Sequence, residues 1–181
     1  MHYNSKQLYT PALKPHEFNH HALIIDTETV GAGPFVEIIE IALCDVTGDV
    51  IYETLVQPIF NPLPPRAKHR RFDRGELTGA PDWPSVFPEV ASLIDGKLLI
   101  AYNAAFDRRA LAATCSRYRV RSDELGWRCA MQLAKRVIGT TKSLTLEGAC
   151  QHFGLTGGNH RAAEDVRATH RLLKALTSTP V

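Results

Sequence analysis

Asp26 and Glu28 are the first residues of the chain whose types and spacing point to chemistry. They directly follow the apolar run at residues 22–25, which is typical of a strand covered on both faces of a sheet. Side chains two positions apart on a strand point to the same face, so the two carboxylates are expected side by side. Such a pair repels unless a cation neutralises it, and Mg²⁺ and Mn²⁺ prefer oxygen ligands. The spacing favours a divalent-metal site; the alternative is a solvated strand end.

A third carboxylate, Asp107, is predicted to face the interior of the protein. It lies in the first turn of a helix expected over residues 104–118, four positions before Leu111 and on the same apolar stripe. An ionised aspartate that faces a core is costly unless it is paired or bound to a metal. A favourable interaction with the helix dipole would explain its place in the first turn, but not its inward orientation.

Asp165 and His160 complete the set of candidate catalytic residues. Asp165 is predicted at the buried edge of a helix over residues 161–176, and His160 precedes it by five residues. Five residues along a helix turn through roughly 140°, so His160 can act beside Asp165 only from the loop before the helix. Gly157-Gly158-Asn159 supplies such a loop. The alternative for a lone loop histidine is a plain surface residue.

Strands and helices must bring these residues together. Apolar runs predict strands over residues 22–25, 37–46, 50–57, 97–102 and near 127–129, with a hairpin at Thr47-Gly48-Asp49. Helical spacing predicts helices over residues 85–95, 104–118, 130–138, 144–153 and 161–176, and Asn103 is a candidate N-cap for the second. Strands come first and then alternate with helices, which predicts an α/β domain on a mixed sheet.

Composition limits the class of protein. The chain has 181 residues, of which 44% are hydrophobic and 22% charged, as suits one compact domain with a real core. A net charge of +2 permits a phosphate-rich partner without requiring one. No signal peptide or membrane-spanning run is found, so a cytoplasmic protein with no membrane partner is expected. The four cysteines form no C-x-x-C pair and are expected to be reduced and mostly buried.

Three segments resemble, in order, the motifs of the proofreading-exonuclease family typified by the epsilon subunit of bacterial DNA polymerase III. IIDTETVG at residues 24–31 resembles D-x-E-T-T-G, and IAYNAAFDRRAL at residues 100–111 resembles H-N-x-x-F-D-x-x-x-L. HRAAEDVRAT at residues 160–169 resembles H-R-A-x-x-D, with the histidine five residues before the aspartate as in the histidine (DEDDh) subgroup. Three motifs in the correct order are far more specific than any one of them.

The resemblance implies a ribonuclease-H-like mixed five-stranded sheet flanked by helices. It covers roughly residues 21–176 as an exonuclease domain, between an N-terminal arm at residues 1–20 and a C-terminal tail at residues 177–181. It also implies two divalent metal ions, Mg²⁺ or Mn²⁺, and a role for each of five residues. Asp26, Glu28 and Asp165 would hold the first metal. Asp26 would also touch the second, with Asp107 acting there largely through water and His160 serving as the general base.

The resemblance further implies contacts with the substrate, a nucleic acid with a free 3′ end. The residues expected near the terminal nucleotide are Thr29, Val30, Phe35, Tyr102, Asn103 and Phe106. Val30 and Tyr102 depart from the family pattern, which usually has threonine and often histidine there, so substrate preference is open. The basic run at residues 66–71 could place Arg70 and Arg71 on backbone phosphates, or it could be a solvated loop.

Three hypotheses about the function are open at this point. Single-stranded DNA is the favoured substrate, with a DNA polymerase as one candidate partner and proofreading or repair as the role. An exoribonuclease that trims tRNA or short RNA would use the same five residues. A polymerase-associated module that binds nucleic acid without cutting it is a third reading. Loss of a carboxylate would mark that inactive module, and all four carboxylates are present.

Overall fold

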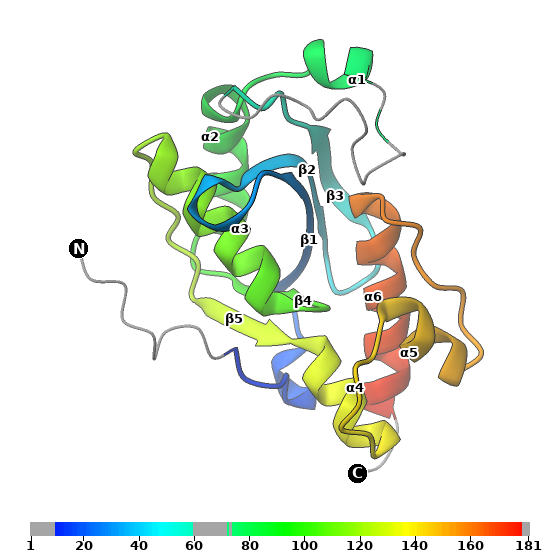
Figure 1. Cartoon of the computed structure of the whole chain (residues 1–181). Coiled ribbons are helices and arrows are strands. Elements are labelled where there is room, and N and C mark those ends of the chain that lie inside the picture. Colours follow the sequence, from blue (N-terminus) through cyan, green and yellow to red (C-terminus); the bar gives the residue numbers. More distant parts are fainter. Residues whose placement is uncertain (1–9, 60–71, 73, 179–181) are drawn as a thin grey trace.

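A computed structural model describes residues 10–59, 72 and 74–178 of the chain. Its centre is a five-stranded sheet in the order β3-β2-β1-β4-β5 (Figure 1). The strands are β1 Ala22–Val30, β2 Glu37–Cys44, β3 Val50–Leu55, β4 Leu98–Ala101 and β5 Gly126–Cys129. β2 runs antiparallel to β1 and β3, whereas β1, β4 and β5 are parallel to one another. The predicted mixed α/β sheet is therefore confirmed.

Helices cover both faces of this sheet. They are α1 Arg74–Thr78, α2 Trp83–Ile94, α3 Ala104–Arg117, α4 Ala130–Ile138, α5 Leu146–His152 and α6 Ala162–Ser178. The apolar spacing predicted the last five of them to within two residues at each end; α6, for example, begins one residue later and ends two residues later than predicted. The five-residue α1 was not predicted, because so short a helix shows little periodicity.

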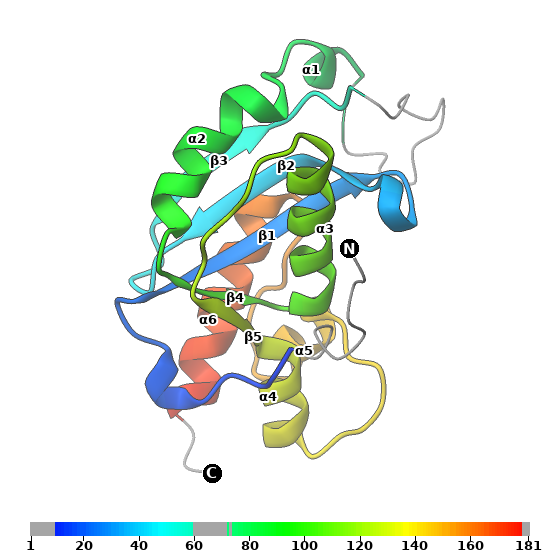
Figure 2. The same cartoon turned by 90° about the vertical axis from the view of Figure 1, so that its left-hand side faces the viewer.

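Alternate residues of β1 face opposite layers of the domain. Leu23 and Ile25 pack in the core formed with α2 and α3, whereas Ala22 and Ile24 pack in the core formed with α4, α5 and α6. Figure 2 shows α3 in front of the sheet and α6 behind it. Because side chains on a strand alternate, Asp26 and Glu28 belong to the face that α6 covers.

β1 is longer than its apolar run suggests. The apolar run ends at Ile25, yet the strand continues past Asp26 and Glu28 to Val30. Beyond Asp26 it pairs with β2 as far as Val30 opposite Glu37, with an irregularity between Glu28 and Thr29. β4 ends at Ala101, so the far part of β1 has β2 as its strand partner and an open edge on the other side.

Residues 10–20 of the expected N-terminal arm lie against the domain. The Leu13 side chain is fully buried, and the backbone N–H of Cys129 donates a hydrogen bond of 2.9 Å to the Pro11 carbonyl. Glu17 pairs with Arg128 at 2.6 Å, which lowers the pKa of Glu17. This part of the arm is thus anchored to the β5 edge of the sheet.

The cysteines match expectation: Cys44, Cys115, Cys129 and Cys150 are buried and free. Within the described residues, no helix is long and apolar enough to cross a membrane.

Candidate active site

A cleft of about 680 Å³ opens where β1 loses its β4 neighbour. It is lined by all five predicted catalytic residues, which come from β1, α3, the loop before α6 and α6 itself. They are Asp26, Glu28, Asp107, His160 and Asp165. The tertiary structure therefore gathers in one place side chains that are up to 139 positions apart in the chain (165 minus 26).

Asp107 enters the cleft from the layer opposite to α6. It lies in the first turn of α3 and is 3% exposed, as its place on the apolar stripe predicts. Its Oδ1 accepts hydrogen bonds from the Thr27 backbone N–H at 2.9 Å and from Thr27 Oγ1 at 2.8 Å. Asp107 thus accepts the hydrogen bond of the Thr27 backbone N–H, which lies on the part of β1 that is not paired with β4. Burial raises the pKa of Asp107 to about 7, although the Thr27 bonds oppose the rise.

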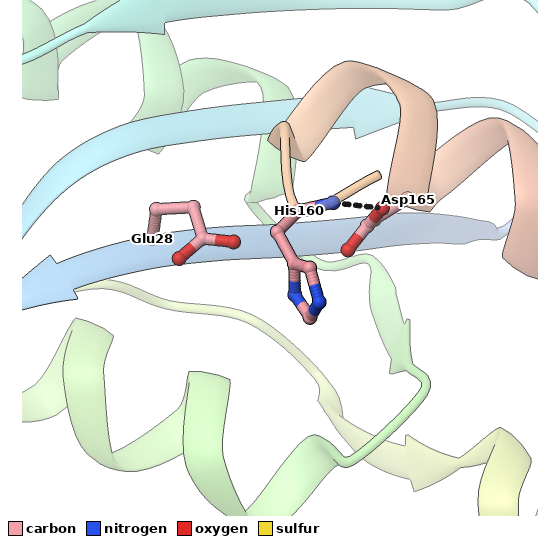
Figure 3. A group of neighbouring side chains, drawn as sticks. All are labelled: Glu28, His160 and Asp165. Carbon is pink, nitrogen blue, oxygen red and sulfur yellow. Dashed lines mark hydrogen bonds between the residues drawn. The ribbon is translucent and has the colours of Figure 1, made fainter. Parts of the chain in front are cut away.

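His160 lies in the loop immediately before α6, where the helical geometry requires it. Its backbone N–H and that of Asn159 donate to Asp165 Oδ1 at 3.1 and 2.9 Å. Figure 3 shows this contact, with the imidazole ring extending from the loop between Glu28 and Asp165. A Cβ at Gly158 would collide with Asp165 Oδ1, so only glycine allows the loop to approach so closely.

His160 itself has a φ of +60°, in the left-handed region that residues with a Cβ seldom adopt. Such a conformation persists when the surrounding contacts hold it, and it clusters at functional sites.

The carboxylates of the cleft repel one another. Burial and then the charges of Asp107, Asp165 and Glu28 raise the pKa of Asp26 well above its usual range. Side-chain ligand atoms of Glu28, His160 and Asp165 lie within 4.8 Å of one another. Crowded carboxylate oxygens with one imidazole fit a hard divalent cation, which would remove the repulsion. Asp26, the third carboxylate of the predicted first-metal set, lines the same cleft but is not among these three residues.

Three of the residues predicted to contact substrate also line the cleft. They are Tyr102, Asn103 and Phe106. The Tyr102 hydroxyl is 2.8 Å from the Thr145 carbonyl and 3.1 Å from the Leu144 carbonyl, so Tyr102 ties β4 to the loop before α5. Asn103 occupies the N-cap position of α3, but its side chain makes no capping hydrogen bond, unlike the prediction. Phe106 is 37% exposed and presents an apolar face.

The other predicted substrate contacts lie elsewhere. Val30 is buried with Ile39 and Leu77, and Thr29 is 8% exposed, so neither lines the cleft. Phe35 is 64% exposed beneath the Arg117 guanidinium, which is 5.6 Å from its ring centre. Val30 therefore makes ordinary packing contacts in the interior of the protein. Arg70 and Arg71 fall outside the described residues.

The structure adds residues that sequence reasoning missed. Lys135 of α4 and residues 143–146 line the cleft, and Glu40 of β2 contacts the loop that carries His160. A signal for Glu40 was available, since it is a charged residue inside the apolar run EIIEIALC. Lys135 carries no such signal, because lysine is common on the solvent face of a helix.

Comparisons with known proteins show the family to which the chain belongs. The model of the exonuclease family RNase_T matches residues 23–173. The uncharacterized exonuclease CP81 of Escherichia phage 186 is 33% identical over 169 residues, covering 85% of this chain and 87% of that protein. The DNA polymerase III PolC-type of Thermotoga maritima is 28% identical over 152 residues, which cover 81% of this chain but only 11% of the polymerase.

A solved structure shares the fold. The nuclease domain of 3′hExo, a DEDDh family member solved bound to rAMP, matches with a TM-score of 0.68 at 16% identity. The match covers 86% of this chain and 89% of that one.

Proposed function

Because the chain belongs to the DEDDh family of 3′→5′ exonucleases, we propose that it hydrolyses the terminal phosphodiester bond of single-stranded DNA and so releases nucleotides one at a time from the 3′ end. Enzymes of this family are phosphodiester hydrolases that use divalent metal ions. The observation that carries the proposal is the single cleft in which four carboxylates and His160 meet.

The carboxylates would hold two ions, Mg²⁺ or Mn²⁺. Bound there, the metals would activate the attacking water and stabilise the leaving 3′ oxygen. Glu28 and Asp165 would contribute ligand atoms from β1 and α6, and Asp26 would contribute a third carboxylate from the same face of β1. Asp107 suits a contact through water, because its Oδ1 already accepts two hydrogen bonds from Thr27.

His160 is proposed as the general base. Its ring is exposed at the cleft and can accept the proton of the attacking water. The loop that carries His160 points the ring into the cleft, where that water would lie. The closeness of its ring to the Glu28 and Asp165 oxygens also suits a metal ligand. Replacement by alanine separates the two roles, since loss of a ligand weakens metal binding and loss of a base does not.

A nucleic-acid strand, rather than a mononucleotide alone, is favoured by the surroundings of the cleft. Phe106 presents an apolar face against which a base can stack without regard to sequence. Lys135 lines both the cleft and a second hollow of about 510 Å³, to which Arg136 also contributes. Among the described residues that line this hollow, none is acidic, which suits backbone phosphates. Contact of Arg70 and Arg71 with phosphates stays a prediction.

Removal of nucleotides from RNA is the second candidate, because the 3′hExo nuclease domain of the same fold was solved with rAMP. A DNA polymerase partner and a role in proofreading or repair stay predictions from the resemblance.

Oligonucleotides labelled at the 5′ end test the proposal, presented in parallel as single-stranded DNA, duplex DNA and RNA with Mg²⁺ or Mn²⁺. We expect a ladder that shortens from the 3′ end, fastest on single-stranded DNA, and no activity with chelator. Asp26→Asn is the inactive control. Internal cuts, release of the 5′ label as a mononucleotide before any ladder appears, or full activity in EDTA would overturn the proposal, whereas a faster RNA ladder would select the second candidate.

A further inference from the structure

We propose that Glu40 and Arg161 are positioning residues that hold His160 in its working conformation. The inference rests on the proposed function of His160 and concerns a contact between β2 and the loop before α6. Glu40 is 6% exposed, and each of its carboxylate oxygens accepts a hydrogen bond. Oε1 accepts from Arg161 Nε at 2.8 Å, and Oε2 accepts from the Ala162 backbone N–H at 2.9 Å.

Glu40 stands at a place where a carboxylate is unfavourable. It lies directly opposite Glu28 in the antiparallel pair of β1 and β2, and like charges in that relation destabilise a sheet. Its charge also contributes to raising the pKa of Asp26. A buried ion pair is in general a weak source of stability compared with apolar packing. Stability alone therefore does not account for Glu40, and its contacts indicate a geometric role.

Those contacts complete a set that fixes every backbone N–H from residue 159 to residue 162. The amides of Asn159 and His160 donate to Asp165, and the amide of Arg161 donates to Asn159 Oδ1 at 3.1 Å. The amide of Ala162 donates to Glu40. The first amides of a helix lack partners within the helix, so these bonds tie the start of α6 to β2.

His160 is consequently held from both sides of its own backbone. Asp165 fixes the N-terminal side, and Glu40 fixes the C-terminal side through Arg161 and Ala162. Arg161 is further confined by Phe72, whose ring centre is 5.1 Å from the guanidinium. The left-handed φ of His160 needs such restraint, because the loop can relax to an ordinary backbone conformation once one side is released. Relaxation would swing the imidazole away from the cleft.

Two substitutions test the idea, because they change charge in opposite directions. Glu40→Gln removes a negative charge near the metal-binding carboxylates, and Arg161→Gln removes a positive one. If both act by releasing His160, both should lower kcat by about 10-fold or more, since small misplacement of a catalytic group is costly. The KM and the Mg²⁺ or Mn²⁺ concentration for half-maximal rate should change little. Arg161→Lys, which keeps the charge, should restore part of the rate.

The same two substitutions in a His160→Ala background provide the sharper comparison. With the base removed, neither substitution should lower kcat further, because the effects of substitutions that act through the same group are not additive. Glu53→Gln is the matched control: Glu53 is an exposed carboxylate that lines the same surface hollow as Glu40 and Arg161, and its replacement should leave the rate unchanged. If Glu40→Gln does not fold, Arg161→Gln carries the test alone.

Two kinetic results would overturn the inference. One is a shift of the metal requirement in opposite directions by the two variants, which would indicate an effect of charge on the metal ions. The other is a full further loss in the His160→Ala background. The NMR signals of the His160 ring give a readout that does not depend on catalysis, and both variants should change them. Unchanged ring signals would refute the positioning role even if the wild type proved to lack 3′ exonuclease activity.

Discussion

Asp107 and His160 serve the same cleft from opposite layers of the domain, and they are held by different means. Asp107 is buried on a helix and is bonded twice to Thr27 of the central strand. His160 is exposed in a loop, has a left-handed backbone, and depends on hydrogen bonds from neighbouring amides to Asp165 and Glu40. Packing of regular elements therefore sets the first position, and a few polar contacts set the second.

This difference indicates how well the surroundings of Asp107 and of His160 should tolerate the loss of one hydrogen bond. On the Thr27–Asp107 side, loss of one hydrogen bond leaves the helix and strand packed and a second bond intact. In the loop at residues 157–161, loss of one contact can free the backbone, because none of these residues is among the buried hydrophobic residues.

The largest effect is expected for Asp165→Asn, which removes one of the charges proposed to bind metal. The rate should fall at least ~100-fold, and further than for His160→Ala, while the amide oxygen still accepts from the loop so that the fold survives. Steady-state cleavage of single-stranded DNA and circular dichroism measure the two properties. Glu164→Gln on the same turn of α6, where Glu164 is half-exposed and pairs with Arg167, is the control and should be nearly neutral. A near-normal rate for Asp165→Asn would refute its assignment.

His160→Ala should slow cleavage by ~100- to 10,000-fold, the usual contribution of a general base. The Mg²⁺ or Mn²⁺ concentration for half-maximal rate, measured by titration, should change little because the carboxylates remain. His152→Ala, at an exposed position outside the cleft, is the matched control. If the metal requirement rises steeply instead, His160 is a ligand rather than the base.

Gly158→Ala tests the loop without changing any charge. The added Cβ would collide with Asp165 Oδ1, so the loop must move away and carry His160 with it. We expect a loss of kcat of roughly 10- to 100-fold, as for other misplaced catalytic groups, with a nearly unchanged melting temperature. Gly79→Ala, where a Cβ meets backbone atoms no closer than 3.7 Å, should leave kcat unchanged. Equal rates for the two variants would mean that the close approach at Gly158 is unimportant.

Thr27→Val makes the corresponding test on the other side and should have the smaller effect. It removes the Oγ1 donor to Asp107 but keeps the backbone donor and the branched shape that packs in the strand. A decrease in kcat of less than ~10-fold is expected, since one side-chain hydrogen bond is lost. If Thr27→Val lowers kcat as much as Gly158→Ala does in the same cleavage assay, the Asp107 and His160 positions do not differ in the way proposed.

The last prediction concerns stability and pH. Burial raises the pKa of Asp107 from 3.8 to about 7, and burial with neighbouring carboxylates raises that of Asp26. A carboxyl group whose pKa is higher in the folded state costs stability as pH rises through the interval between its unfolded and folded pKa. Without metal, the melting temperature should therefore be higher near pH 5 than near pH 8, by ~3 °C or more.

Two changes should reduce that difference: Mg²⁺ or Mn²⁺ at pH 8, and the substitution Asp26→Asn without metal. Both relieve the repulsion, one by adding positive charge and the other by removing a negative one. Differential scanning calorimetry in EDTA measures the effect. A melting temperature that rises from pH 5 to pH 8 and does not respond to Asp26→Asn would show that the carboxylates do not repel in the folded protein.

Much of this architecture could be predicted from local patterns. The residue range of α4 and the loop position of His160 followed from apolar spacing and helix geometry, because periodicity records which face of an element is buried. The placing of Asp26 and Glu28 on one strand face followed from the alternation of side chains. The three motifs indicated the exonuclease family, which the family match and the phage relative confirm.

The tertiary structure alone decided how those motifs meet. No spacing rule indicates that β1 continues to Val30, because pairing with β2, and not the apolar run, extends the strand. The bond between Thr27 and Asp107 joins residues 80 positions apart, and the contact between Glu40 and Ala162 joins residues 122 positions apart. Periodicity within one element carries no information on which distant element will satisfy its open amides. The sequence by itself determined the set of chemical groups, and the packing of β2 and α3 against the end of β1 determined their geometry.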